Sequence, residues 1–204
     1  RADTACERVF APWPDMADLM RATRTPLWAL ESGAPVTEFN ILGISLQHEL
    51  NFTNVLYLLD LAGIPLRRSD RQASAPLIVG GGPAAFNPEP LADFFDVFVI
   101  GDGEQAVTEL VDLYLASGQD KMALLEHLAG PEAPDGFYVP DAFKPEYNAD
   151  GTVAGIQALA GRPVVRKALL ANLETTPVPS RPIVPFLDVI HDRVTLEIFR
   201  GCTR

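Results

Sequence analysis

The sequence is poor in the residues that bind metals or form disulfides. Among 204 residues there are two cysteines, Cys6 and Cys202, and three histidines, His48, His127 and His191. Two cysteines do not make a disulfide framework, and neither C-x-x-C nor any zinc-type spacing of cysteine and histidine occurs. We therefore expect neither a disulfide-stapled secreted domain nor a zinc site, and we expect a reducing, cytoplasmic compartment.

Long hydrophobic runs and an excess of basic residues are also absent. No apolar run approaches the roughly 20 residues that a membrane-spanning helix needs, and no basic leader followed by an apolar core opens the chain. With 27 acidic against 16 basic residues, the formal net charge is −11. Binding to a phosphate backbone needs a basic face, so nucleic acid in general is not an expected partner. A membrane is not an expected partner either, because no apolar run is long enough to span one.

Strand and helix patterns alternate through residues 1–130. Apolar runs predict strands at 5–10, Phe39–Leu46, Pro76–Val79 and Asp96–Ile100, and the continuous run at Phe39–Leu46 is typical of a strand buried on both faces. Helices are predicted from a cap at Asp15 to Arg24, around 55–62 with an end at Gly63, at Gln105–Ala116 and at Lys121–Leu128. Strand–loop–helix units of this kind indicate an α/β fold with a doubly wound, Rossmann-like parallel sheet, which binds ligands at the carboxyl ends of its strands.

The pattern changes after Gly130. Extended segments at Phe137–Val139, Phe143–Tyr147 and Thr152–Leu159, with Asp150-Gly151 as a turn, predict a small antiparallel β appendage over residues 131–170, to which Val164–Leu169 adds a strand. Four prolines within 177–185 indicate an extended linker, assigned to residues 171–190. Val194–Phe199 is then predicted to be the first strand of a further domain that begins at 191–204.

Glycines follow the strand at Pro76–Val79. The loop Gly80-Gly81-Gly82-Pro83 either lets a ligand approach the backbone closely or forms a tight turn, and the two interpretations are about equally supported. It lacks the G-x-G-x-x-G spacing of dinucleotide sites and the Lys-Ser/Thr of a P-loop. Pro83 disfavours a long helix directly after the glycines.

Polar residues follow the other two strands. Ser45 and His48 are candidates to face a ligand, and the alternative is that a nearby serine or Asn51 caps the next helix. Asp102 and Glu104 either bind hydroxyl or amide groups of a ligand or, with better support, cap the following helix, whose dipole favours acids at its start.

The two cysteines are expected to differ in role. Cys6 lies in an apolar, strand-like context that predicts a core residue. Cys202 follows Arg200-Gly201 at the end of a predicted strand, the place where barrel enzymes carry active-site residues.

Four stretches together resemble one family. They are ERVFAPWPDM at 7–16, ILGISLQHELNFTNVLYLLDLAGIPL at 41–66, PLIVGGGPAAFNPEPLADFFDVFVIGDGE at 76–104 and VTLEIFRGCTR at 194–204. The chain is similar to radical S-adenosylmethionine (radical SAM) proteins that carry an N-terminal B12-binding-type domain. The pairing of VGGGP, NPEP and GDGE with a terminal RGCTR is the most specific part.

The resemblance implies an iron–sulfur enzyme, in which residues 191–204 begin the radical SAM domain with the first strand of its barrel. In the family, RGC opens a C-x3-C-x2-C motif whose thiolates hold a [4Fe–4S] cluster, and Cys202 is similar to its first cysteine. The cluster would cleave S-adenosylmethionine to a radical that abstracts hydrogen from a substrate, which the sequence does not identify. The other two cysteines would lie past Arg204, so the expectation is an inactive fragment of a longer enzyme, with the first strand and helix of the B12-type domain also outside it.

The resemblance also implies a cobalamin site in members that bind this cofactor. Ser45, Leu46, Gly80, Gly81 and Gly82 correspond to positions that contact the nucleotide tail. An alternative function is a non-catalytic cobalamin- or nucleotide-binding module that acts as a sensor or docking domain. A nicotinamide-dependent oxidoreductase is less supported, because the glycines lack the dinucleotide fingerprint.

Overall fold

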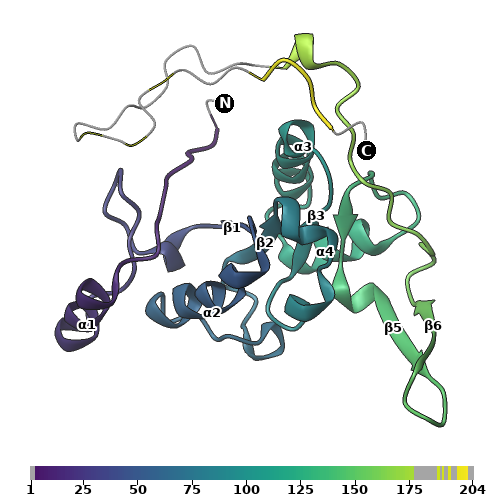
Figure 1. The fold of residues 1–204 in the computed structure, drawn as a ribbon, viewed down its shortest axis with the longest axis horizontal. Helices are drawn as coiled ribbons and strands as arrows, with labels where there is room; N and C mark the ends of the chain where they lie inside the picture. Colours follow the sequence, from purple (N-terminus) through teal and green to yellow (C-terminus); the bar gives the residue numbers. More distant parts are fainter. Residues whose placement is uncertain (1–2, 177–187, 189, 191–192, 194–196, 202–204) are drawn as a thin grey trace. The chain divides into compact units, whose positions relative to one another are not determined.

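A computed structural model describes residues 3–176, 188, 190, 193 and 197–201 (Figure 1). The chain divides into two units, Arg1–Leu169 and Leu170–Arg204. The second unit contains a short 3-10 turn at Leu173–Thr175 and a bidentate ion pair between Arg200 and Glu197.

The first unit contains four helices and six strands among its described residues. In chain order they are α1 (Pro14–Thr23), β1 (Ile41–Ser45), α2 (Phe52–Leu61), β2 (Leu77–Gly81), β3 (Val97–Val99), α3 (Gly103–Ala116), α4 (Lys121–Ala129), β4 (Phe137–Tyr138), β5 (Phe143–Tyr147) and β6 (Val153–Ala158). The helices and the three first strands of the main sheet lie within a few residues of their predicted positions. No helix in the described part of the chain is long and apolar enough to cross a bilayer.

The main sheet has the strand order β1-β2-β3-β4. The strands β1, β2 and β3 are parallel, and β4 is antiparallel to β3. The prediction of a parallel α/β sheet is confirmed for three strands. It is wrong for Phe137–Tyr138, which extends this sheet instead of the antiparallel appendage.

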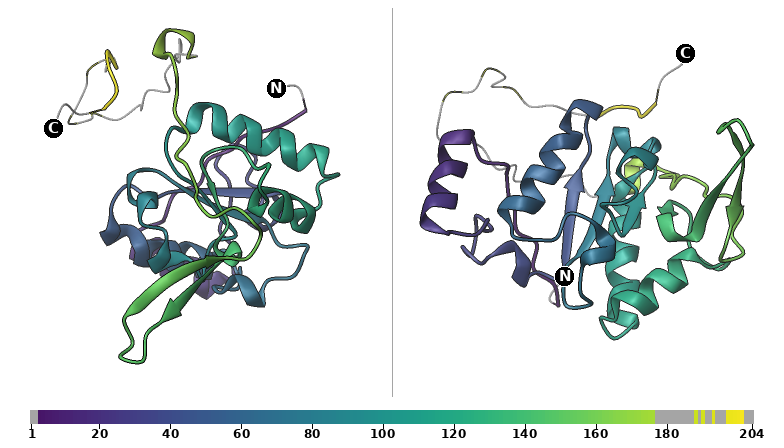
Figure 2. Two further views of the ribbon diagram at one scale, coloured as in Figure 1. Left: turned by 90° about the vertical axis from the view of Figure 1, so that its right-hand side faces the viewer. Right: turned by 90° about the horizontal axis from the view of Figure 1, so that it is seen from below.

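Helices cover both faces of the sheet, as Figure 2 shows for α2 and α3. On one face Ile78 and Phe98 pack with Val55 and Leu59 of α2. On the other face β2 and β3 residues pack with Ala106 and Leu110 of α3 and with two leucines of α4. Alternate residues of β2 and β3 therefore enter two separate cores, and these strands are buried on both faces.

The edge strand β1 differs from its prediction. Its residues are half-buried, with Gly43 and Ser45 exposed. Burial on both faces is thus found in β2 and β3 and not in β1, because β1 pairs with β2 on one side and has no strand partner on the other within the described residues. The apolar run predicted a strand correctly, but could not predict that it lies at an edge.

The N-terminal segment also departs from expectation. Residues 5–10 form no strand, because the backbone of Arg8 bonds to the Leu30–Glu31 loop and not to the sheet. Cys6 is consequently exposed, and its prediction as a core residue is wrong. The cap of α1 is Trp13 rather than Asp15, because Pro14 occupies the first helical position, where its missing N–H costs nothing.

The predicted hairpin at β5 and β6 is confirmed (Figure 1). Its turn closes through bonds from Asn148 N–H to Thr152 O and from Gly151 N–H to Asn148 O. Of the strand predicted at Val164–Leu169, only a parallel bridge between Ala168 and Gly101 forms. The described residues do not include the four prolines of the predicted linker, residues 194–196 of the last predicted strand, or Cys202. Residues Glu197–Phe199 are described, and they carry no strand assignment.

Candidate functional site

The carboxyl ends of the parallel strands lie next to one another. Ser45 at the end of β1 is paired with Gly81 of β2, which is paired in turn with Val99 of β3. Ser45, Gln47 and His48 are exposed there. The structure thus brings the predicted positions Ser45, Leu46 and Gly80–Gly82 together at the edge where α/β sheets bind ligands.

Two of the three glycines are required by packing within the chain. A Cβ atom at Gly80 would lie 2.6 Å from Cδ1 of Phe98, a fully buried residue of β3 whose ring lies 4.7 Å from that of Phe95. Gly82 has a φ of +105°, and a Cβ atom there would lie 2.9 Å from the carbonyl oxygen of Leu46. The tight-turn interpretation therefore explains Gly82, and packing of the strand against Phe98 explains Gly80, both without a ligand.

Leu46 is likewise used within the chain. Its side chain is 1% exposed. Its N–H donates to Gly81 O at 2.6 Å, and its carbonyl accepts from Ala84 N–H at 2.9 Å. These bonds join the end of β1 to the glycine loop. A short 3-10 turn at Pro83–Phe86 follows the loop, which agrees with the prediction that no long helix begins there.

Among the predicted positions, Ser45 and Gly81 have space beside them that a ligand could occupy. Around a Cβ atom placed on Gly81, the nearest atoms belong to Val99 at 3.9 Å, which is ordinary contact. The exposed hydroxyl of Ser45 stands on the neighbouring strand at the same register. A hydroxyl beside an uncluttered backbone can hydrogen-bond a polar ligand.

The other polar candidates have capping positions. His48 Nδ1 accepts from Leu50 N–H at 3.2 Å and caps the 3-10 turn Glu49–Asn51, while Asn51 makes no side-chain cap. Asp102 occupies the N-cap position of α3, and Glu104 lies in its first turn. The capping role expected of Asn51 is therefore not found, and His48 makes a cap that was not predicted. Asp102 occupies the predicted cap position of α3, but its side chain makes no cap hydrogen bond.

The NPEP segment, Asn87–Pro90, serves the packing of β4. The Tyr138 hydroxyl donates to Glu89 Oε1, and the Tyr138 ring stacks on Phe143 with centroids 5.1 Å apart. Burial raises the pKa of Tyr138, and the hydrogen bond to Glu89 raises it further. Glu89 thus fastens the loop before β3 to the strand that follows α4.

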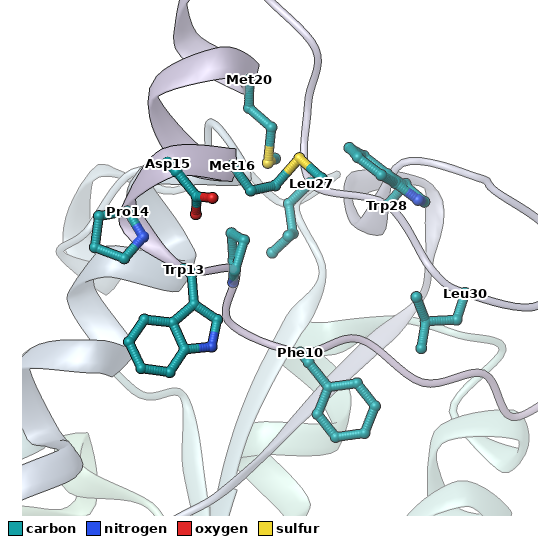
Figure 3. Close-up of a pocket in the computed structure, with 10 residues that line it drawn as sticks. Phe10, Trp13, Pro14, Asp15, Met16, Met20, Leu27, Trp28 and Leu30 are labelled. Atoms are coloured by element: carbon teal, nitrogen blue, oxygen red, sulfur yellow. The ribbon is translucent and has the colours of Figure 1, made fainter. Parts of the chain in front are cut away.

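A hydrophobic pocket lies away from this edge (Figure 3). Its volume is about 730 Å³, and Phe10, Trp13, Met16, Trp28 and Leu30 are among its lining residues. Trp13 is 82% exposed, which is unusual for so large an apolar side chain. No sequence motif indicated this pocket, although both tryptophans of the chain, Trp13 and Trp28, line it.

The described residues contain no group of three or more histidine, cysteine or carboxylate side chains that could hold a metal ion. Cys202, the predicted metal ligand, lies outside the described residues. The position of the predicted cluster ligand therefore has no structural description.

Comparison with known protein families gives one match. The family model described as radical SAM proteins, N-terminal, matches residues 1–140. No curated protein and no solved structure matches the chain. Since the matched region includes the whole parallel sheet and extends over well more than half of the sequence, the chain belongs to the radical SAM proteins and carries the N-terminal region of that family.

Proposed function

We propose that this chain is the N-terminal part of a radical SAM enzyme whose [4Fe–4S] cluster takes Cys202 as one ligand. The observation that carries the proposal is the family match over residues 1–140. The sequence Arg200-Gly201-Cys202 supports it, because thiolates are the ligands that such clusters prefer.

The residues of the chain fit this cluster only in part. The chain has two cysteine thiols, Cys6 and Cys202, and they lie in different units. Two further thiolates would have to come from polypeptide beyond the 204 residues. When bound, the cluster supplies the electron that cleaves S-adenosylmethionine, and no step of that reaction falls to a described residue.

Cys202→Ala should abolish cluster binding in the natural full-length protein. The measurement is visible absorbance with iron and sulfide content after anaerobic reconstitution, and we expect nearly all of both to be lost. The matched control is Cys6→Ala, which removes the exposed thiol in the first unit and should leave the cluster intact. Equal cluster content in Cys202→Ala and wild type would refute the assignment, and cobalamin binding without any cluster would favour the non-catalytic sensor.

We also propose that the carboxyl end of the sheet holds cobalamin, which would make the domain a Rossmann-like, B12-binding type. Of the five predicted contacts, Ser45 offers an exposed hydroxyl and Gly81 offers the room beside it for a nucleotide tail, while the Gly81 carbonyl accepts from Leu46 N–H. Leu46, Gly80 and Gly82 would act through the shape that they give to the loop. When bound, cobalamin supplies methyl-transfer or rearrangement chemistry, while the protein orients it.

Gly81→Val should weaken the binding of hydroxocobalamin by at least about 10-fold, which corresponds to about 1.4 kcal/mol. The added side chain stands where the tail would pass, yet its Cβ atom would have only atoms of Val99 within 4 Å, so we expect the variant to fold. The matched control is Gly43→Val, on an exposed position of β1 where a Cβ atom meets nothing within 4 Å. Spectrophotometric titration measures both, and equal affinities, or no binding by the folded wild type, would refute the site.

A further inference from the structure

Exposed apolar side chains surround the hydrophobic pocket of the first unit (Figure 3). Its lining includes Phe10, Trp13, Met16 and Leu30, and each of these four side chains is exposed. A single exposed apolar residue is ordinary, but a group of them around one cavity is typical of a binding site, because a ligand there would remove their surface from water.

Other lining residues of the pocket belong to the protein core. Met20 and Leu27 are buried, and both are members of the core cluster that α2 also enters. The segment before α1 is fastened to α2 as well, because the Tyr57 hydroxyl donates to Pro12 O at 3.2 Å. The cavity therefore exists before any ligand binds, and its volume of about 730 Å³ lies in the range of small-molecule sites.

A single carboxylate accompanies this apolar lining. Asp15, in the first turn of α1, is the one charged residue among those that line the pocket, and its side chain has no hydrogen bond or ion pair with any described residue. Two arginines of the same segments have other partners, since Arg8 pairs with Glu31 at 2.6 Å and Arg21 with Asp60 at 3.1 Å. The pocket thus combines an uncompensated negative charge with aromatic rings, whose faces also attract cations.

We propose that this pocket binds a small organic cation, an amine or quaternary ammonium group carried on an apolar body. Asp15 would pair with the positive charge, and Trp13, which lines the pocket from the same end of α1, would add cation–π attraction (Figure 3). Phe10, Met16 and Leu30 would cover the apolar body, and the flexible thioether of Met16 can adapt to its shape. The pocket lies away from the carboxyl edge of the sheet, so this inference does not depend on the iron–sulfur cluster or on cobalamin.

Tryptophan fluorescence of residues 1–204 reports binding directly, because both tryptophans of the chain line the pocket. The probes are octylamine, octanol and octanoate, which have the same number of carbons and differ in charge. We expect the amine to bind at least about 5-fold more tightly than the alcohol, and the carboxylate to bind more weakly than both. Equal affinities, or no fluorescence change with any probe in the folded chain, would overturn the proposal. A fluorescence change with protein concentration alone, together with a doubled mass in solution, would also overturn it and assign the pocket to a second copy.

Two aspartates of α1 provide a matched pair of variants. Asp15→Asn should weaken the binding of octylamine at least about 5-fold and leave that of octanol within about 2-fold, because it removes only the charge. The control is Asp18→Asn, whose carboxylate does not line the pocket and lies 3.7 Å from Arg21, and it should leave both affinities unchanged. Trp13→Leu keeps an apolar side chain without the ring, so it should weaken the amine more than the alcohol. Equal effects of the two aspartate variants on octylamine, in chains that circular dichroism shows to be folded, would count against the site.

Discussion

Arg71→Met should lower the free energy of unfolding by about 3–5 kcal/mol, because it breaks a buried ion pair from one side only. The Arg71 side chain is fully buried, and Nη1 lies 3.6 Å from Oδ2 of Asp96, which is 6% exposed. Urea unfolding followed by circular dichroism measures the effect on residues 1–204.

The hydrogen bonds of Arg71 explain why the expected loss is so large. Its Nε and Nη2 donate to the carbonyl oxygens of Pro65, Leu66 and Phe94 at 2.6–2.9 Å. Asp96 accepts from Ile78 N–H at 2.7 Å and thereby fixes β2 to the start of β3. Burial lowers the pKa of Arg71, and Asp96 opposes this shift. Removing the guanidinium would leave three carbonyls and a carboxylate buried with fewer partners.

The matched control for Arg71 is Arg67→Met. Arg67 pairs with Asp93 at 2.5 Å, but both side chains are about 60% exposed. A solvent-exposed pair contributes little, so this variant should lose less than about 1 kcal/mol. The double variant Arg71→Met/Asp96→Asn should recover part of the loss, since no buried charge then remains. Similar losses for the two single arginine variants would contradict the assignment.

Gly82→Ala should destabilise the first unit by about 2–3 kcal/mol. The φ of +105° is strained for any residue with a side chain, and the added Cβ atom would press on the backbone of Leu46 at 2.9–3.2 Å. Because Leu46 joins the end of β1 to the glycine loop, the strain falls on the connection between two strands. Thermal or urea unfolding measures the loss.

Gly81→Ala serves as the neighbouring control. Gly81 is in β2, its φ is not in the left-handed region, and the nearest atom to an added Cβ lies at 3.9 Å. We expect a change within about 1 kcal/mol of wild type, because alanine also restricts the unfolded chain. If Gly81→Ala were as damaging as Gly82→Ala, the division of the glycines into structural and open positions would be wrong.

Local patterns were sufficient for most elements of the first unit. The periodicity of α2 and α3, the stop at Gly63 and the Asp-Gly turn between β5 and β6 are short-range signals, and each element formed near its predicted place. The α1 cap was misassigned because the helix starts at Pro14, two residues earlier than a cap at Asp15 would allow. The strand expected at 5–10 failed because strand formation needs a partner, which a local pattern does not identify.

The candidate site was predictable in its location but not in the role of each residue. Glycines and polar residues after strands indicated the carboxyl edge, and pairing of Ser45 with Gly81 brings them together. Whether a glycine serves a ligand or a neighbouring ring depends on contacts such as Gly80 with Phe98, which lie 18 positions apart in the sequence. The ion pair of Arg71 with Asp96 was missed for the same reason.

The sequence by itself determined the α/β class, the helices, the three parallel strands and the family resemblance, because hydrophobic periodicity, turn residues and short motifs are local properties of the chain. Only the tertiary structure decided that β1 is the edge strand among the described strands and that β4 joins the main sheet. It alone also decided that the backbone of Leu46 lies against Gly82. Strand order and burial are set by which distant segments pack together, and the same apolar run is compatible with a central strand or with an open edge.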